Sequence, residues 1–445
     1  SACEFACVNF RPDKITQTMD HRTIAISLFI IAYILFVFLP ARRTAIAVIA
    51  SLLVILTETI TIRQSFFAIN WNVMGLFIGT LVVADIFMES RAPAWLAEVI
   101  VNKAKNTTWA ILFICMLTGF ISAFVENVAT VLIVAPIALA LAKKLQINPV
   151  NMMIGIIISS NLQGTATLIG DPPSMLLGGF AKMTFWDFFF YKGRPSIFFA
   201  VELGAIASFF VLFFIFRKHR EKVRLISVEK VKSWVPSILL VVLIIALATS
   251  SFFDTDFSYM AGIICMIFGI VSLLWGKFVN RVPVITSIKS LDWDTTLFLM
   301  SIFILVGSIT ATGWIETIAD FLSKQVGKNI FLGYTLIVFI SVFVSAFVDN
   351  VPFLAAMLPV AIIMAAKLNM NPSLFLFGLL IGTSLGGNIT PIGASANIVG
   401  CGLLKKEGYH VKFWDFVKIG LPFTLVAVSA AYLFIWFVWG PAASK

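Results

Sequence analysis

The sequence predicts an all-α polytopic membrane protein built from two inverted-topology repeats, with about 10 spans, two opposed re-entrant hairpins and two broken helices. Three observations predict this fold class. Of the 445 residues, 60% are hydrophobic and 12% are charged, whereas soluble domains have about 45–50% apolar and about 25% charged residues. The motifs of the first half recur in the second half. Two apolar stretches in each half are interrupted by polar residues at matching places.

Continuous apolar runs give the membrane spans. A helix needs roughly 20 predominantly apolar residues to cross a bilayer. An amphipathic stretch at 92–104 is predicted to lie on the membrane surface. The predicted spans are 24–40, 44–62, 71–88, 196–216, 234–252, 258–276, 293–312 and 419–439.

Two longer apolar regions, 107–144 and 330–366, carry an acid–amide pair near the middle. A carboxylate inside a bilayer is costly unless it faces water or a partner, so an acid at this depth indicates function. We expect each region to enter and leave the membrane on one face, as a re-entrant hairpin. The tips are Glu126-Asn127 and Asp349-Asn350. Each Asn is suited to be the N-cap of the second arm, which is the structural alternative to a role in binding.

The regions 152–181 and 374–404 are apolar but interrupted by Gly, Thr, Asn and Pro. Irregular backbone persists at membrane depth only where protein buries it or where it lines a cavity. Paired interruptions in two halves of a membrane protein are typical of a transport site near the midplane. We therefore expect two broken helices that line such a site.

The two halves match at positions 223 residues apart. Ser122–Asn127 and Ser345–Asn350 agree at five of six positions. The linker 217–233 is rich in Lys and Arg, which places it in the cytoplasm. Each repeat is predicted to have three spans, a hairpin, a broken span and a closing span. Because the hairpin adds no crossing, each repeat crosses the membrane five times, and this odd number inverts the second repeat. The predicted organisation is an N-terminal segment 1–23, repeat 1 at 24–216, the linker 217–233 and repeat 2 at 234–440.

The predicted transport site combines the hairpin tips with the polar residues of the broken helices. Its acids are Glu126, Asp349 and Asp171, and the proposed core holds no Lys or Arg. This balance favours a cation, a proton or a neutral solute. The neutral oxygens of Asn127, Thr167, Asn350 and Thr390 are the Na⁺ candidates, and no cofactor is expected beyond the coupling Na⁺ or H⁺. The candidate residues are Glu126, Asn127, Asn161, Gly164, Thr165, Thr167, Asp171, Asp349, Asn350, Gly387, Asn388, Thr390, Ser395 and Asn397.

The motifs resemble the ion transporter superfamily, within its ArsB/NhaD branch of arsenite permeases, NhaD-type antiporters and P proteins. The resemblance extends from about residue 70 to residue 440. In repeat 1 it rests on Ser-Ala-Phe-Val-Glu126-Asn127-Val-Ala-Thr130 and Gly170-Asp-Pro-Pro-Ser174. In repeat 2 it rests on Asp349-Asn350-Val-Pro352 and Thr390-Pro-Ile-Gly-Ala-Ser395.

The resemblance implies inverted repeats, an elevator motion of the hairpins and broken helices, and a homodimer. Relatives that transport dicarboxylates with sodium carry Ser-Asn-Thr at each tip. Here Asn127 and Asn350 are kept, but each is flanked by an acid and a valine. This departure disfavours dicarboxylates and favours cation or proton coupling.

The leading functional hypothesis is a secondary active transporter that exchanges Na⁺ for H⁺, with Glu126 and Asp349 alternating between proton and cation. One alternative is proton-coupled efflux of arsenite or another neutral oxyacid. The other is sodium-coupled transport of a carboxylate anion. An enzyme is not expected, because the sequence has no His-Glu-x-x-His and no nucleophile motif.

The expected partners are the lipid bilayer, a small inorganic ion or small anion or oxyacid, and a second copy of the chain. The net charge of +10 is assigned to the cytoplasmic loops of a membrane protein and not to nucleic-acid binding. The predicted location is a prokaryotic inner or plasma membrane.

Overall fold

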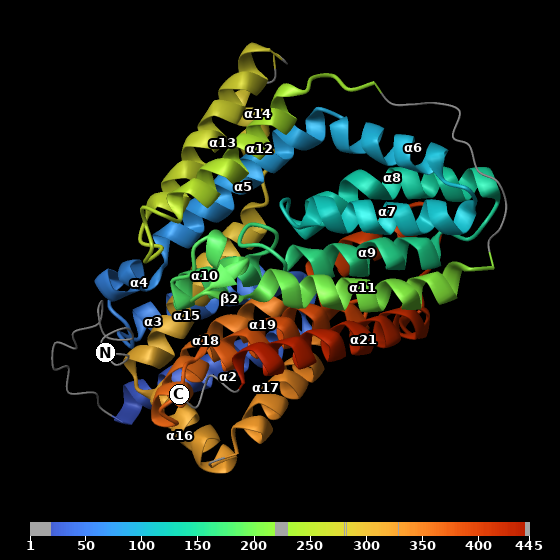
Figure 1. Cartoon of the computed structure of the whole chain (residues 1–445). Coiled ribbons are helices and arrows are strands. Elements are labelled where there is room, and N and C mark those ends of the chain that lie inside the picture. Colours follow the sequence, from blue (N-terminus) through green and yellow to red (C-terminus); the bar gives the residue numbers. More distant parts are fainter. Residues whose placement is uncertain (1–18, 219–229, 280, 282, 328, 441–445) are drawn as a thin grey trace.

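The computed structural model describes residues 19–218, 230–279, 281, 283–327 and 329–440, and the side chains of residues 19 and 20 are not described. These ranges are nearly all helical, which confirms the predicted all-α class (Figure 1). One antiparallel pair of two-residue strands, β1 (Phe190–Tyr191) and β2 (Arg194–Pro195), was not expected. Most of the predicted segment 1–23 and of the linker 217–233 lies outside the described residues.

The first half of the chain contains both predicted interrupted regions. The hairpin consists of α7 and α8, and the broken helix consists of α9 and α10. The helices of this half are α2 (Met19–Phe38), η1 (Pro40–Arg42), α3 (Arg43–Leu56), α4 (Ile62–Ala68), α5 (Trp71–Glu89), α6 (Ala92–Lys103), α7 (Thr107–Ser122), α8 (Asn127–Leu145), α9 (Val150–Gly164), α10 (Pro172–Ala181), η2 (Trp186–Phe188) and α11 (Ile197–Phe216).

The second half repeats this order of elements. Its hairpin is α17 and α18, and its broken helix is α19 and α20. The helices are α12 (Val235–Ser250), α13 (Met260–Phe278), α14 (Val284–Ser290), α15 (Trp293–Ala311), α16 (Trp314–Val326), α17 (Ile330–Ser345), α18 (Asn350–Lys367), α19 (Ser373–Gly386), η3 (Gly387–Ile389), α20 (Ser395–Lys406) and α21 (Phe413–Trp439).

Two predicted spans have other boundaries in the structure. The expected span 44–62 is wrong, because α3 ends at Leu56 and a separate helix, α4, begins after Thr61. The Thr61 side chain accepts a hydrogen bond from the Gln64 backbone and the Gln64 side chain accepts one from the Thr61 backbone, which is a capping box that starts a new helix. The closing span begins at Phe413 and not at residue 419.

Elements of the two halves pack on each other reciprocally. Helix α5 packs on α13, and α15 packs on α3. The half-helix α10 packs on the hairpin arm α18, and α20 packs on α8. Figure 1 shows α5, α12 and α13 together at the upper left, α7, α8 and α9 stacked at the right, and α17 and α18 in the lower part. Two halves related by a two-fold axis would give this exchange of contacts; their inverted orientation in the membrane stays a prediction.

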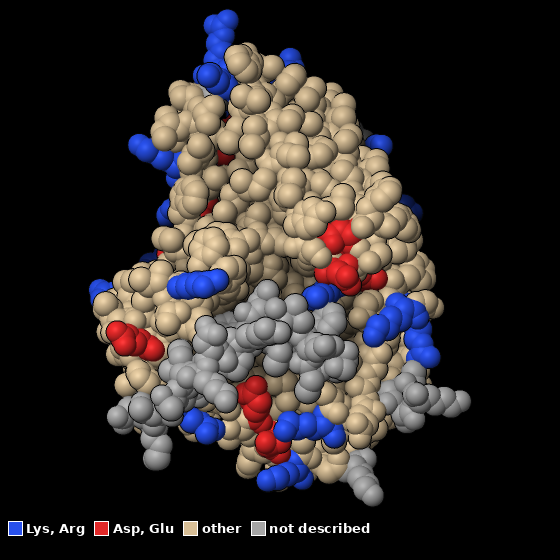
Figure 2. All heavy atoms as spheres, turned by 90° about the vertical axis from the view of Figure 1, so that its left-hand side faces the viewer, with Lys and Arg blue, Asp and Glu red and all other residues tan. Residues whose placement is uncertain are grey.

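The surface of the described part suits a lipid environment. Eight of its helices are long and apolar enough to cross a membrane. Large side chains such as Phe214, Ile245 and Phe343 point outward from these and neighbouring helices. Figure 2 shows a face on which residues other than Lys, Arg, Asp and Glu form most of the surface. The chain is therefore an integral, multi-pass membrane protein.

Candidate functional site

Each hairpin tip begins its second arm with an acid as the N-cap. The Glu126 carboxylate accepts a hydrogen bond from the backbone N–H of Ala129 at 3.0 Å. The Asp349 carboxylate accepts one from Val351 at 3.1 Å. The acids, and not the Asn residues, are therefore the N-caps of these helices, which removes capping as the alternative role of Asn127 and Asn350. A carboxylate bonds the free N–H groups and also complements the positive helix end, which a neutral amide does less well.

The tip asparagines face the broken helices. Asn127 Oδ1 accepts a hydrogen bond from the Ser122 hydroxyl at 2.8 Å. A Cβ built on Gly164 would lie 2.0 Å from that same Oδ1, so only glycine fits there. This glycine lets the tip of the hairpin approach the backbone of the broken helix.

The second tip repeats this arrangement. Asn350 Oδ1 accepts a hydrogen bond from the Ser345 hydroxyl at 2.6 Å, and a Cβ on Gly387 would lie 2.8 Å from it. The structure thus brings Asn127 to Gly164 and Asn350 to Gly387, as two matched contacts between a hairpin and a broken helix.

A buried threonine of each broken helix forms a hydrogen bond with the hairpin of its own half. The Thr167 hydroxyl donates to the carbonyl oxygen of Ala123, and the Thr390 hydroxyl donates to that of Ala346. Both threonines are buried in the interrupted part of a broken helix. Hydroxyl, carbonyl and amide oxygens therefore lie at each tip, and neutral oxygens of this kind coordinate Na⁺ where a spanning helix is broken.

Three asparagines from both halves meet in the centre. The Asn161 amide donates to Asn388 Oδ1 and to Asn397 Oδ1, each at 2.8 Å. Asn397 Nδ2 donates to the carbonyls of Gly387 and Thr390 at 2.8 and 2.7 Å. The predicted residues Asn161, Asn388 and Asn397 thus form one buried network, which ties the two broken helices together.

Asp171 bonds residues that are close to it in the sequence. Its carboxylate accepts from the backbone N–H of Ser174 at 2.9 Å, which makes it the N-cap of α10. The Thr165 hydroxyl donates to the same carboxylate at 3.4 Å. Asp171 and Thr165 therefore lie together, in a cluster that fixes the start of the half-helix.

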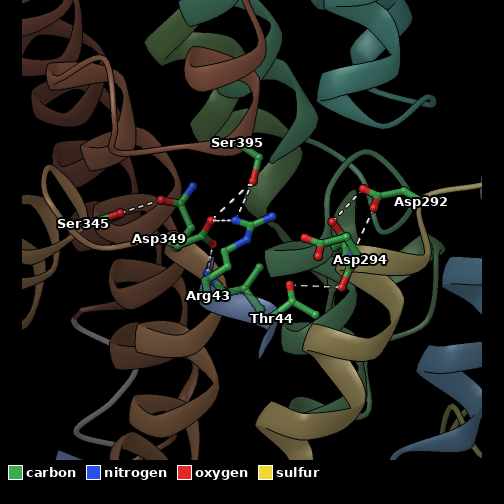
Figure 3. A network of polar contacts seen from close by, with 10 residues as sticks. Arg43, Thr44, Asp292, Asp294, Ser345, Asp349 and Ser395 are labelled. Atoms are coloured by element: carbon green, nitrogen blue, oxygen red, sulfur yellow. Dashed lines mark hydrogen bonds and ion pairs between the residues drawn. The ribbon is translucent and has the colours of Figure 1, made fainter. Parts of the chain in front are cut away.

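The second hairpin tip contains an arginine that the sequence analysis did not place there. Arg43, the first residue of α3, forms an ion pair with Asp349. It also donates to the Ser395 hydroxyl at 2.7 Å, at the first residue of α20. Figure 3 shows Arg43 pointing at Asp349 and Ser395, with Asp292 and Asp294 from the start of α15 on its other side. The expected core without Lys or Arg is therefore wrong.

The two acids at the tips consequently differ in charge compensation. Asp349 has a cationic partner, and both side chains are largely buried, with 15% of Asp349 and 14% of Arg43 exposed. Glu126 is half-buried and has no ion-pair partner among the residues that the structure describes. Among the described residues, the two hairpin tips therefore hold one compensated and one uncompensated carboxylate.

The sequence does not reveal the contact between Arg43 and Asp349, because a run of apolar residues follows Arg43. Arg43 is separated from Asp349 by 306 positions, and a basic residue between two spans normally lies at the membrane surface. The usable signal in the sequence was the Thr61–Gln64 capping box, which starts a new helix and leaves α3 with 14 residues. A bilayer needs roughly 20 residues per span, so a shorter helix can begin inside the membrane.

Comparison with known proteins gives the family. The chain matches the citrate transporter (CitMHS) family over residues 33–283 and 254–445. An uncharacterized transporter of Mycobacterium bovis is 27% identical over 423 residues, which cover 93% of this chain and 97% of that protein. The P protein of Sus scrofa is 26% identical over 503 residues, which cover 93% of this chain and 59% of the P protein.

Two solved structures share the fold. The YdaH transporter of Alcanivorax borkumensis aligns with a TM-score of 0.57 at 14% identity, covering 82% of this chain and 85% of YdaH. MtrF of Neisseria gonorrhoeae, from a class of antimetabolite efflux pumps, aligns with a TM-score of 0.56 at 13% identity, covering 94% of this chain and 95% of MtrF. The relatives are transporters, in agreement with the prediction of a transporter and not an enzyme. The chain belongs to the citrate transporter (CitMHS) family and is a secondary transporter of that type.

Proposed function

We propose that this transporter exchanges Na⁺ for H⁺ and that Glu126 is the carboxylate that binds them in turn. The observation that carries the proposal is the half-buried carboxylate of Glu126 at the first hairpin tip, which has no ion-pair partner in the described part of the chain. An acid inside a membrane protein needs a proton or a cation to compensate its charge. The hydroxyl of Thr167, the carbonyl of Ala123 and the amide of Asn127 supply neutral oxygens at the same tip.

The proposal includes an elevator motion. The hairpins and broken helices of both halves pack on one another through α8 with α20 and α18 with α10. Helices α3, α5, α13 and α15 form a second group through their own reciprocal pairs. Movement of the first group along the second would expose the Glu126 tip to one side of the membrane at a time.

A second candidate, transport of a carboxylate anion, is favoured by Arg43. Arginine is the side chain best suited to bind a carboxylate with two parallel hydrogen bonds. The family is that of citrate transporters, and the Ser395 hydroxyl lies beside the guanidinium. For such a substrate to bind, Asp349 would first have to release Arg43.

Proteoliposomes with a pH dye inside separate the two candidates. Exchange predicts that an external pulse of Na⁺ or Li⁺ raises the internal pH, while an equal pulse of choline does not. Separate pulses of citrate and of arsenite are given in the absence of Na⁺ and Li⁺. Uptake of radioactive citrate is also measured with and without Na⁺, because sodium-coupled transport of a carboxylate requires the ion. If Na⁺ and Li⁺ leave the internal pH unchanged and citrate or arsenite changes it, Na⁺/H⁺ exchange is wrong.

A further inference from the structure

The second hairpin tip carries its own positive charge. Arg43 donates to the Asp349 carboxylate and to the Ser395 hydroxyl, and Ser395 Oγ itself lies 3.3 Å from Asp349 Oδ2. The guanidinium thus bonds two oxygens at the second tip, whereas the matching acid of the first tip has no cationic partner among the described residues. Figure 3 shows these three side chains in one cluster.

Packing holds Arg43 in this position. Its guanidinium carbon lies 5.0 Å from the centre of the Phe298 ring on α15, within the range of a cation–π contact. The next residue, Thr44, donates to the carbonyl of Asp294 at 3.4 Å, which joins the start of α3 to the start of α15. Since α3 packs along α15, the arginine belongs to a rigid pair of helices and reaches the hairpin from outside it.

At the first tip, the described residues that correspond to Ser395 and Arg43 have neither a hydroxyl nor a charge. The position 223 residues before Ser395 is Pro172, which has no hydroxyl. Helices α3 and α13 end at Leu56 and Phe278, and α5 and α15 begin at Trp71 and Trp293, so these elements match at an offset of 222. At this offset Arg43 corresponds to Cys265, a buried, uncharged residue against Gly79.

We infer that Arg43 is a tethered cation which replaces the exchangeable ion at the second hairpin tip, so that each chain couples to one cation, at the Glu126 tip. The inference rests on the proposed cation exchange and deepens it, because it assigns the number of coupling ions and the residue that sets it. A guanidinium stays protonated at any pH that the protein meets. In the conformation that the structure shows, Asp349 is therefore neutralised without Na⁺, and only the Glu126 tip depends on Na⁺ or H⁺ for compensation.

The experiment counts bound sodium in the purified full-length protein, by equilibrium binding of radioactive Na⁺ at alkaline pH. The wild type is expected to bind one Na⁺ per chain. Arg43→Gln frees Asp349 and is expected to bind two, whereas Arg43→Lys keeps the charge and is expected to bind one. Arg42→Gln, a change at the exposed neighbouring residue, is the matched control and is also expected to bind one.

Two further variants keep the test decisive if Arg43→Gln does not fold. Asp349→Asn and the double variant Arg43→Gln/Asp349→Asn are expected to bind one Na⁺, since neither contains a free acid at the second tip. Loss of the bound Na⁺ in Asp349→Asn, or no gain in folded Arg43→Gln, would overturn the inference. A wild type that binds no Na⁺ argues against sodium exchange; a gain of one Na⁺ in Arg43→Gln would then still support the tethered cation.

Discussion

Arg43 at the start of α3 donates a hydrogen bond to the carboxylate of Asp349 at the start of α18, and 306 positions of sequence separate the two residues. The contact compensates one of two matched acids and leaves the other, Glu126, without a partner in the described part of the chain. The two hairpins thus share a local structure but differ in charge.

Removing one member of the Arg43–Asp349 pair should destabilise the protein. Arg43→Gln and Asp349→Asn each leave a largely buried charge unpaired, which is expected to cost about 3 kcal/mol. The double variant removes both charges and should recover most of that loss. Thermal unfolding of the four proteins in detergent measures the coupling, and additive losses in the double variant would show that the two side chains act independently.

The contact between Gly164 and Asn127 predicts that no side chain larger than that of glycine is tolerated at position 164. A Cβ on Gly164 would lie 2.0 Å from Asn127 Oδ1, so Gly164→Ala forces the hairpin tip away from the broken helix, with an expected cost of about 1–3 kcal/mol. Na⁺-driven proton flux in proteoliposomes should also be lower in Gly164→Ala than in the wild type. Gly402→Ala, where a Cβ meets nothing within 4 Å, is the control. Equal flux in both variants would rule out this close approach.

The two buried threonines should differ in their effect on coupling. Thr167→Val removes a hydroxyl oxygen from the uncompensated tip, and Thr390→Val removes the matching one from the tip that Arg43 compensates. We expect the sodium concentration for half-maximal flux to rise about tenfold in Thr167→Val, which corresponds to about 1.4 kcal/mol of binding free energy. Thr390→Val should leave it nearly unchanged. The opposite order of effects would place the coupling ion at the second tip.

Asp254, in the loop between α12 and α13, predicts a pH dependence of stability. Burial alone would raise its pKa, but hydrogen bonds from the backbone of Ser258, Met260 and Tyr259 hold the pKa below the ordinary value of 3.8. A lowered pKa in the folded state stabilises the fold above pH 3.8, and this contribution is lost as the pH falls below that value.

The matched measurement compares the unfolding temperatures of the wild type and Asp254→Asn between pH 3 and pH 7. The wild type should be more stable near neutral pH, and the difference should shrink as the pH falls below 3.8. A difference that stays constant over the whole range would mean that the ionised form is not the one that the loop stabilises.

The sequence predicted most of the fold because hydrophobic periodicity and duplicated motifs report directly on helices. Helix α5 and its counterpart α15 begin at Trp71 and Trp293, as predicted. The break at residues 57–61 was missed because the surrounding residues are apolar, although Thr61 and Gln64 form a capping box. The homodimer, the elevator motion and the plasma-membrane location stay predictions.

The site was predicted only as far as local sequence determines it. Motif spacing identified Asn127, Gly164 and Thr167, and the structure brings these residues to one hairpin tip. Arg43 could not be assigned by spacing, because its contact with Asp349 depends on how α3 and α18 each pack against α15. The distribution of charge over the site therefore depends on the tertiary structure and could not be predicted from local sequence.

The most direct test of the account is the proton flux that a Na⁺ pulse drives in proteoliposomes containing Glu126→Gln. We predict that this variant loses the rise of internal pH, while Glu89→Gln, a half-buried acid at the end of α5, retains it. A Glu126→Gln protein that is folded and still moves protons in response to Na⁺ would contradict the assignment of Glu126 as the exchanging carboxylate.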